Sequence, residues 1–174
     1  MLYRHIRALQ ATVLTAVVLL LLVGMGGCGD ACSENKNALP LAGFYSKEMP
    51  GSEISVDSLE IKGVDVKGDS ILSSADKVIS EVYLPFRIDS DTTRYALRRY
   101  GPHAGIDTLT FIYNRRPQLA SIECGVSYIF EMIDIQYCGE LIDSVSCPRG
   151  YIDNTNARNL QIFLKGATTD QEPW

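Results

Sequence analysis

Apolar and polar side chains alternate along several stretches of the chain with a period of two residues, the period of a β-strand rather than of a helix. The alternation is clearest over 82–88, 108–113 and 160–164. Shorter runs that also favour strands lie at 42–45, 94–99 and 140–145. The run 126–135 is apolar on both faces, as expected of a strand buried on both sides. A chain with this pattern is expected to bury its apolar faces between packed sheets.

Turn-forming residues separate these runs, at 67–69, 89–91, 101–102 and 153–154. The apolar phase shifts between Val56 and Leu59, across Asp57 and Ser58, which predicts a bulge or a turn there. Only 73–79 could form one short turn of helix. We therefore predict an all-β fold, an antiparallel β-sandwich of about 7–9 strands over residues 42–166. Because proline has no N–H to donate, Pro85 places its strand at the edge of a sheet.

The N-terminal residues predict export and lipidation. Arg4 and Arg7 precede an uncharged apolar run over 11–23, which is shorter than the roughly 20 residues that span a bilayer and suits a signal peptide. The small residues before Cys28, in Met25-Gly26-Gly27-Cys28, resemble the lipobox of bacterial prolipoproteins. We expect a signal peptide at 1–27 and an acylated Cys28. The alternatives are an ordinary secretory signal or a single anchor helix.

The lipid would be followed by a flexible tether over 28–41, which is polar and ends beside Pro40, and the chain would close with a disordered tail over 167–174. The net charge is −5, and losing Arg4 and Arg7 with the signal peptide makes it more negative. Phosphate contacts need clustered Lys and Arg, so nucleic-acid binding is not expected. The membrane would be reached through the lipid anchor, most simply at the outer membrane, with its periplasmic or surface face left open.

The chain has five cysteines. If Cys28 carries the lipid, the other four permit three disulfide pairings in an oxidising compartment. We favour Cys32 with Cys124, which ties the tether to the domain, and Cys138 with Cys147, which closes a short loop across an expected hairpin. A zinc site is not expected because no CxxC spacing is present and the exported part has one histidine. No cofactor is expected either.

The chain resembles an uncharacterised family of Bacteroidota lipoproteins that is defined only as a domain of unknown function. The stretches that carry the resemblance run in order along the chain: Cys28, Cys32 followed by Pro40, Gly43-Phe44-Tyr45, Leu84-Pro85-Phe86, Asp107-Thr108-Leu109-Thr110-Phe111, Glu123-Cys124-Gly125 and Asn159-Leu160-Gln161-Ile162. The resemblance implies an all-β lipoprotein with no known activity. It also favours the pairing of Cys32 with Cys124.

Catalytic chemistry has weak candidates. His103 is the only histidine after the signal peptide, it lies in a glycine-rich turn, and no GxSxG motif accompanies it. Asp89 and Asp91 faintly resemble a calcium loop, but the full pattern with its distal glutamate is missing. Aspartate and serine also build turns, and we favour that interpretation. No catalytic residue and no metal ligand is therefore assigned.

Arginines and tyrosines gather around one predicted hairpin and form a candidate binding patch. Its members are Arg94, Arg98, Arg99, Arg115 and Arg116, with Tyr95, Tyr100 and Tyr113. Pairing 94–99 with 108–115 would bring several of them together on a surface that could bind an anionic glycan or a lipid headgroup. The other interpretation, which we favour, is a charged solvent face that protects a sheet edge.

Five Asp-Ser/Thr triplets resemble the O-glycosylation acceptor of exported Bacteroidota proteins. The acceptor hydroxyls would be those of Ser58, Ser70, Thr92, Thr108 and Ser144. Turns that lead into strands favour the same residues, so both interpretations stay open.

The function expected from the sequence is a non-enzymatic envelope module that binds a protein or a glycan or has a structural role. The alternative is an unrecognised hydrolase acting on envelope polymers. That alternative requires His103 or the Asp89–Asp91 pair to meet another polar group in a pocket.

Overall fold

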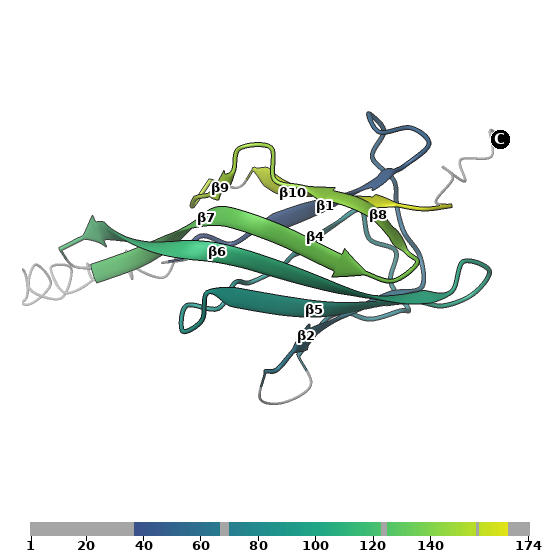
Figure 1. Ribbon diagram of the computed structural model, residues 1–174, viewed down its shortest axis with the longest axis horizontal. Helices are drawn as coiled ribbons and strands as arrows, with labels where there is room; N and C mark the ends of the chain where they lie inside the picture. The colour runs from purple at the N-terminus through teal and green to yellow at the C-terminus, as the bar shows by residue number, and fades with distance from the viewer. Residues whose placement is uncertain (1–36, 67–69, 123–124, 156, 167–174) are drawn as a thin grey trace, which may run out of the picture. The chain divides into compact units, whose positions relative to one another are not determined.

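The computed structural model describes residues 37–66, 70–122, 125–155 and 157–166, which all lie in one compact unit that begins at residue 35. These residues form two sheets that pack as a β-sandwich (Figure 1). The four-stranded sheet has the order β4 (Glu81–Tyr83), β1 (Leu41–Ser46), β10 (Arg158–Leu164), β8 (Ile142–Ser146). The six-stranded sheet has the order β3 (Ile71–Ser73), β2 (Leu59–Val64), β5 (Thr92–Arg99), β6 (Gly105–Ser121), β7 (Gly125–Cys138), β9 (Tyr151–Ile152). The predicted all-β sandwich is confirmed.

The described strands number ten, more than the sequence indicates, because two of them are too short to show a period. These are β3 and β9. The helical turn considered at 73–79 is not formed: Ser73 ends β3, and the Lys77 N–H donates to the Ser74 carbonyl in a tight turn. No helix among the described residues has the length and apolar character to cross a membrane.

The core lies between the inward faces of the two sheets. Phe44 and Ile162 come from the four-stranded sheet, and Ile61, Leu97 and Phe111 from the six-stranded one, all with at most 1% of their surface exposed. In β2 and β5 the fully buried positions are two residues apart, as the alternation predicts, whereas β1 is buried along its whole length. One strand pair departs from the antiparallel expectation, because β1 and β10 run parallel, with Phe44 opposite Ile162.

The segment that follows β4 completes the core without being a strand. The strand expected over 82–88 is shorter than predicted: only Glu81–Tyr83 pairs with β1, at the edge of the sheet, and Pro85 lies beyond its end. Leu84 and Phe86 are nevertheless buried. Phe86 stacks on Tyr113 at 4.5 Å between ring centroids and meets the edge of Phe130 at 5.3 Å. This packing fixes the direction of the next residue, Arg87.

The shift of apolar phase before β2 is a turn, as predicted. Ser58 has a φ of 53°, in the left-handed region, and β2 begins at Leu59. Val56, on the other side of the turn, bridges to Ile79 and is fully buried. The turn therefore lets residues that are three apart in the sequence point into the same core.

The expectation that 126–135 is buried on both faces is wrong. Val126 and Ile133 of β7 are 51% and 59% exposed. Ile133 is a bulge, since Ile112 pairs with Asp134 and Tyr113 with Met132. The pairing of β5 with β6 starts at Thr92 opposite Ile112, so the part of the β6–β7 hairpin nearer its turn has no β5 beside it. There the hairpin has fewer neighbours to cover it.

The fold begins before the expected boundary at residue 42. Ala38 is 3% exposed, and its N–H donates to the carbonyl of Tyr128 in β7 at 2.8 Å. The Tyr128 N–H in turn donates to Oδ1 of Asn37 at 3.1 Å. Both backbone groups of Tyr128 thus face away from its partner Pro117, which explains how β6 accommodates a proline that has no N–H.

Candidate functional site

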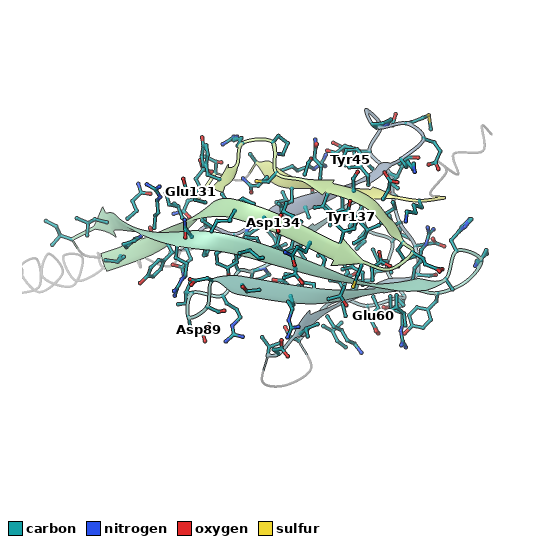
Figure 2. The ribbon with its side chains drawn as sticks, in the orientation of Figure 1. Tyr45, Glu60, Asp89, Glu131, Asp134 and Tyr137 are labelled. Carbon is teal, nitrogen blue, oxygen red and sulfur yellow. The ribbon has the colours of Figure 1, made fainter. Side chains whose placement is uncertain are left out.

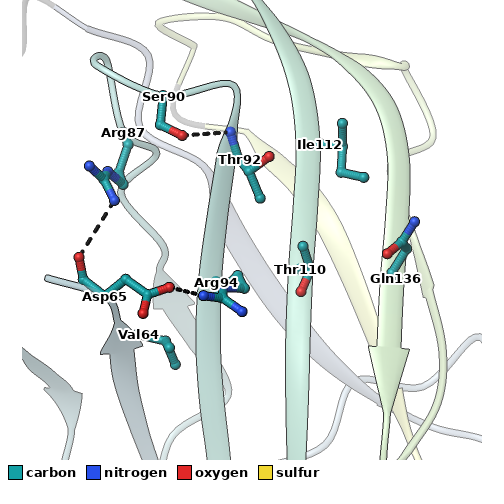
Figure 3. Close-up of a pocket in the computed structure, with 9 residues that line it drawn as sticks. All are labelled: Val64, Asp65, Arg87, Ser90, Thr92, Arg94, Thr110, Ile112 and Gln136. Atoms are coloured by element: carbon teal, nitrogen blue, oxygen red, sulfur yellow. Dashed lines mark hydrogen bonds and ion pairs between the residues drawn. The ribbon is translucent and has the colours of Figure 1, made fainter.

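A shallow hollow of about 500 Å³ opens on the solvent-facing side of the six-stranded sheet (Figure 3). Its floor includes a row of residues that lie directly opposite one another on four neighbouring strands: Val64, Arg94, Thr110 and Gln136. These side chains share a face because partners in an antiparallel ladder point to the same side. Their neighbours two residues along in each strand also face outward, which adds Thr92 and Ile112.

Arg87 lines the hollow from the connection between β4 and β5, and the core holds its backbone. The Arg87 N–H donates to Oγ1 of Thr93 at 2.9 Å, and the Tyr113 hydroxyl donates to the Arg87 carbonyl at 2.8 Å. Because Tyr113 uses its single proton there, Thr93 donates to the Tyr113 oxygen, 2.6 Å away. The Tyr95 hydroxyl donates to the carbonyl of Pro85. Burial raises the pKa of both tyrosines, so they stay neutral hydrogen-bond donors.

Acidic side chains hold the two guanidinium groups of the hollow. Arg94 bonds the Asp65 carboxylate, and Arg87 reaches the Asp65 carbonyl at 3.5 Å (Figure 3). Arg87 also donates hydrogen bonds to the Asp89 carboxylate from Nε and Nη2, at 3.0 and 2.9 Å. That pair raises the pKa of Arg87 and lowers the pKa of the Asp89 carboxyl. Asp65 itself has a φ of 61°, a conformation that Asp and Asn tolerate better than most residues.

The hollow offers hydrogen-bond donors rather than a nucleophile and base. Ser90 accepts a hydrogen bond from the Thr92 N–H at 3.2 Å. The other polar side chains carry guanidinium, hydroxyl and amide groups and one carboxylate, that of Asp65, which is paired with Arg94. A smaller hollow of about 130 Å³ adjoins it and shares Val64, Arg87 and Arg94 with it. The arrangement can bind an anionic or hydroxyl-rich ligand, because guanidinium groups recognise carboxylates and phosphates through several N–H groups at once.

The structure does not gather the arginines and tyrosines of the expected patch on one surface. The pairing of β5 with β6 is as predicted, but its register places Arg94 opposite Thr110 and leaves Arg115 and Arg116 beyond the end of β5. Tyr95 and Tyr113 point into the core. Arg98 lies 5.9 Å from the ring centroid of Tyr100, near the other end of β5.

Most of these arginines instead form separate ion pairs across neighbouring segments. Arg99 bonds Asp57 at 3.0 Å. Arg115 bonds Asp91 at 2.8 Å, and Arg116 bonds Glu131 at 2.7 Å. Of the expected patch, only Arg94 lines the hollow. Arg87 was missed by the sequence reasoning, although its place in the alternation at 82–88, out of phase with Leu84 and Phe86, marks it as facing outward.

The residues considered for catalysis do not meet. His103 is exposed in the turn between β5 and β6, whereas Asp89 and Asp91 lie in the turn that precedes β5, at its opposite end. The two aspartates form ion pairs with Arg87 and Arg115. The hydrolase alternative required His103 or the Asp89–Asp91 pair to meet another polar group in a pocket. None of these three residues lines either hollow, so the hollows lend this alternative no support. In the described part of the chain, no cluster of three or more His, Cys, Asp or Glu side chains could hold a metal ion.

The expected bridge between Cys138 and Cys147 is not formed, and both are free thiols. It was expected across a hairpin, but the two consecutive strands β7 and β8 belong to different sheets. Cys138 is exposed at the end of β7, whereas Cys147 packs partly buried against the core. Burial raises the pKa of the Cys147 thiol. Cys28, Cys32 and Cys124 lie outside the described residues, as do the signal peptide and the tail.

The five candidate acceptors of O-glycosylation are all half-buried. Ser58 and Ser70 directly precede a strand and Thr92 begins one, which agrees with the local explanation of the triplets. Thr108 and Ser144 lie inside β6 and β8. The glycosylation of these residues stays a prediction.

Comparison with known proteins finds one family. The model of a family of unknown function, DUF6452, matches residues 58–164, more than half of the chain. Neither the search among curated proteins nor the search among solved structures found a match. The matched region runs from the turn before β2 to the end of β10 and contains every residue that lines the hollow.

Proposed function

Because the chain belongs to the DUF6452 family, whose function is unknown, we propose a function from the site itself: a lipid-anchored envelope protein that binds an acidic glycan. The signal-like N-terminus and the residues before Cys28 support the lipid anchor and an outer-membrane destination. The solvent-facing hollow supports ligand binding. The module acts by binding rather than by chemistry, since the hollow presents donors without a nucleophile–base pair.

The observation that carries this proposal is the cross-strand row of Arg94, Thr110 and Gln136 with Arg87 beside it. Rigid strands hold these donors at fixed spacing, which lowers the entropic cost of binding. A volume of about 500 Å³ is in the range of ligand pockets and suits one or two sugar residues. The lining has no aromatic ring on which a neutral sugar could stack, so recognition falls to the guanidinium groups, which favours carboxylated or phosphorylated sugars.

Asp65 occupies part of the donor set in the absence of ligand. Its carboxylate bonds Nη2 of Arg94, while the other N–H groups of that guanidinium have no hydrogen-bond partner among the described residues. A ligand carboxylate can therefore bind Arg94 beside Asp65 or displace it. The Arg94–Asp65 pair is about half exposed, so its loss costs the fold little.

Binding is tested by calorimetric titration of the protein with oligogalacturonate, with a neutral maltooligosaccharide as the control ligand. Arg94→Gln removes charge-assisted hydrogen bonds, each worth about 1.5–3 kcal/mol, so we expect affinity to fall by about tenfold or more. Asp65→Asn keeps the backbone conformation and frees Arg94, so we expect tighter binding.

The matched control is Arg116→Gln, which removes an exposed, paired arginine outside the hollow and should leave affinity unchanged. The proposal fails if the wild-type protein prefers the neutral sugar, or if the Arg94 and Arg116 variants lose affinity equally.

The lipid anchor is tested separately by the intact mass of protein purified from its native membranes. We expect a chain that begins at Cys28 and carries the added mass of acyl chains. A native chain that retains Met1 and has no acyl mass would contradict the anchor but would leave glycan binding open.

A further inference from the structure

The turn end of the β6–β7 hairpin carries exposed apolar side chains. Leu119 and Val126 lie directly opposite each other on the two strands and are 66% and 51% exposed. Ile122, in the turn, is 95% exposed. We call these three residues the hairpin tip. Its position is clear in Figure 1, where β6 and β7 continue past the end of β5.

Charge is almost absent around the hairpin tip. Between Arg116 and Glu131, which pair with each other, the sequence has one ionisable acid, Glu123, and no basic residue. Elsewhere the six-stranded sheet exposes a dense pattern of ion pairs, such as Arg94 with Asp65 and Arg99 with Asp57. An apolar end that is bounded by an ion pair is the composition of a segment that enters the interfacial layer of a lipid bilayer.

The N-terminal segment enters the fold next to the hairpin tip. Asn37 and Ala38 bond both backbone groups of Tyr128, which is two residues from Val126 along β7. Residues 28–36 separate Asn37 from the proposed anchor at Cys28, and at full extension they reach only about 30 Å. The opposite end of β6, at Ile106, is about 50 Å along the strand from the turn.

We propose that the hairpin tip inserts into the same lipid surface that holds the acylated Cys28, as a second contact of the protein with the membrane. This inference rests on the lipid anchor proposed above. The short tether keeps the lipid surface within reach of the tip, and the anchor raises the local concentration of lipid around three side chains that alone would bind it weakly.

The test places a fluorophore at the hairpin tip. The only tryptophan is Trp174, so Ile122→Trp in a Trp174→Phe background gives a single reporter. The full acylated chain is reconstituted in phosphatidylethanolamine–phosphatidylglycerol vesicles with and without brominated acyl chains. We expect blue-shifted emission and at least twofold stronger quenching by brominated lipid than for the control.

The matched control is Ile106→Trp in the same background. Ile106 is also an exposed isoleucine, at 55%, and it lies near the start of the same strand, next to β5. Its emission should be that of a water-exposed tryptophan, without quenching. A second variant, Leu119→Asp with Val126→Asp, should abolish the quenching of the reporter at 122 while the mass added by the acyl chains stays the same.

Four outcomes would overturn the inference. Equal quenching at positions 122 and 106 would show no preferred contact. Emission at 122 that shifts with protein concentration in the absence of lipid would show that a second copy covers the tip instead. A sample without acyl mass would remove the anchor and the inference together, whereas an acylated sample without quenching would overturn the inference alone.

Discussion

Thr93, Tyr95 and Tyr113 connect the core of the protein to its candidate site. Their hydroxyls bond the backbone of Pro85 and Arg87, in a segment that has no sheet partner of its own. Without these bonds the two carbonyls would be buried without a hydrogen-bond partner or would bond water, and the orientation of the Arg87 side chain would be poorly fixed. Three core hydroxyls therefore position one residue of the hollow, which is why their side chains are polar in an otherwise apolar row.

Because of Tyr95, we expect the free energy of unfolding to decrease at alkaline pH. Burial raises its pKa above the ordinary value of about 10, so both the folded and the unfolded chain are neutral at this group below that pH. Above pH 10 the unfolded chain ionises first, which favours unfolding, and stability is lost as pH rises. Each such tyrosine contributes a slope of at most about 1.4 kcal/mol per pH unit.

The prediction is measured by urea unfolding between pH 9 and 11.5. Tyr95→Phe lowers stability uniformly by removing the bond to Pro85, but it should flatten the decline above pH 10 relative to the wild-type protein. Tyr100→Phe, at an exposed tyrosine in the β5–β6 turn, should keep the wild-type slope. Identical slopes for all three proteins would show that Tyr95 does not titrate with unfolding.

At the level of residues, the sequence predicts burial better than contact. The alternation correctly assigns Leu109 and Phe111 to the core. The same alternation places Tyr113 in phase with them, but tyrosine suits both a core and a binding patch, so its residue type led to the wrong assignment. The partners of Arg94 and Arg115 depend on register and on the turns before β5, and nothing in the spacing of charges fixes either of them.

Among the elements, the corner between β7 and β8 carries the chain from one sheet to the other. Asp107 of β6, which is 1% exposed, accepts hydrogen bonds from the N–H groups of Leu141 and Ile142 at 2.9 and 2.8 Å. Gly139 has a φ of 137°, and a Cβ there would lie 2.0 Å from the Asp107 carboxylate. The corner therefore needs a glycine packed on a buried carboxylate.

Gly139→Ala is expected to destabilise the protein by about 2–4 kcal/mol, because it combines backbone strain with displacement of a buried hydrogen-bonded carboxylate. The free energy of unfolding in urea measures the effect. Gly51→Ala is the matched control: nothing lies within 4 Å of the added Cβ, so a change within about 0.5 kcal/mol is expected. If Gly139→Ala lowered the free energy of unfolding as little as Gly51→Ala does, the corner would be able to relax around the added methyl group.

Strands with a long alternating pattern could be predicted from the sequence. Strands that form only because a neighbouring strand offers them hydrogen-bond partners could not. β5, β6 and β10 show the alternation directly. β3 and β9 have two or three residues and exist because β2 and β7 offer them free backbone groups. The parallel pairing of β1 with β10 joins segments far apart in the sequence, so no local signal announces it. The same limit hid the change of sheet between β7 and β8, and with it the separation of Cys138 from Cys147.

For the whole molecule, the hairpin tip and the hollow follow one another along strand β6. Leu119 at the tip and Ile112 beside the hollow are on the same strand, about 23 Å apart. Contact of the tip with lipid would therefore hold the hollow clear of the membrane surface, with its donors facing the envelope space. A ligand on a neighbouring polymer could then be bound without displacing lipid.

Cysteine labelling tests whether the tether is joined to this hairpin. The favoured disulfide would link Cys32 of the tether to Cys124, which follows Ile122 by two positions in the sequence. Both cysteines lie outside the described residues. With iodoacetamide at pH 8 and no reductant, exposed Cys138 should label quickly, and Cys147 slowly, because burial shields it and raises its pKa, which lowers its thiolate fraction. Cys32 and Cys124 should label only after reduction, and a peptide that contains both should be recovered before it. If Cys32 and Cys124 label without reductant, no disulfide joins the tether to the domain. The contacts of Asn37 and Ala38 would then be the ones that hold it among the described residues.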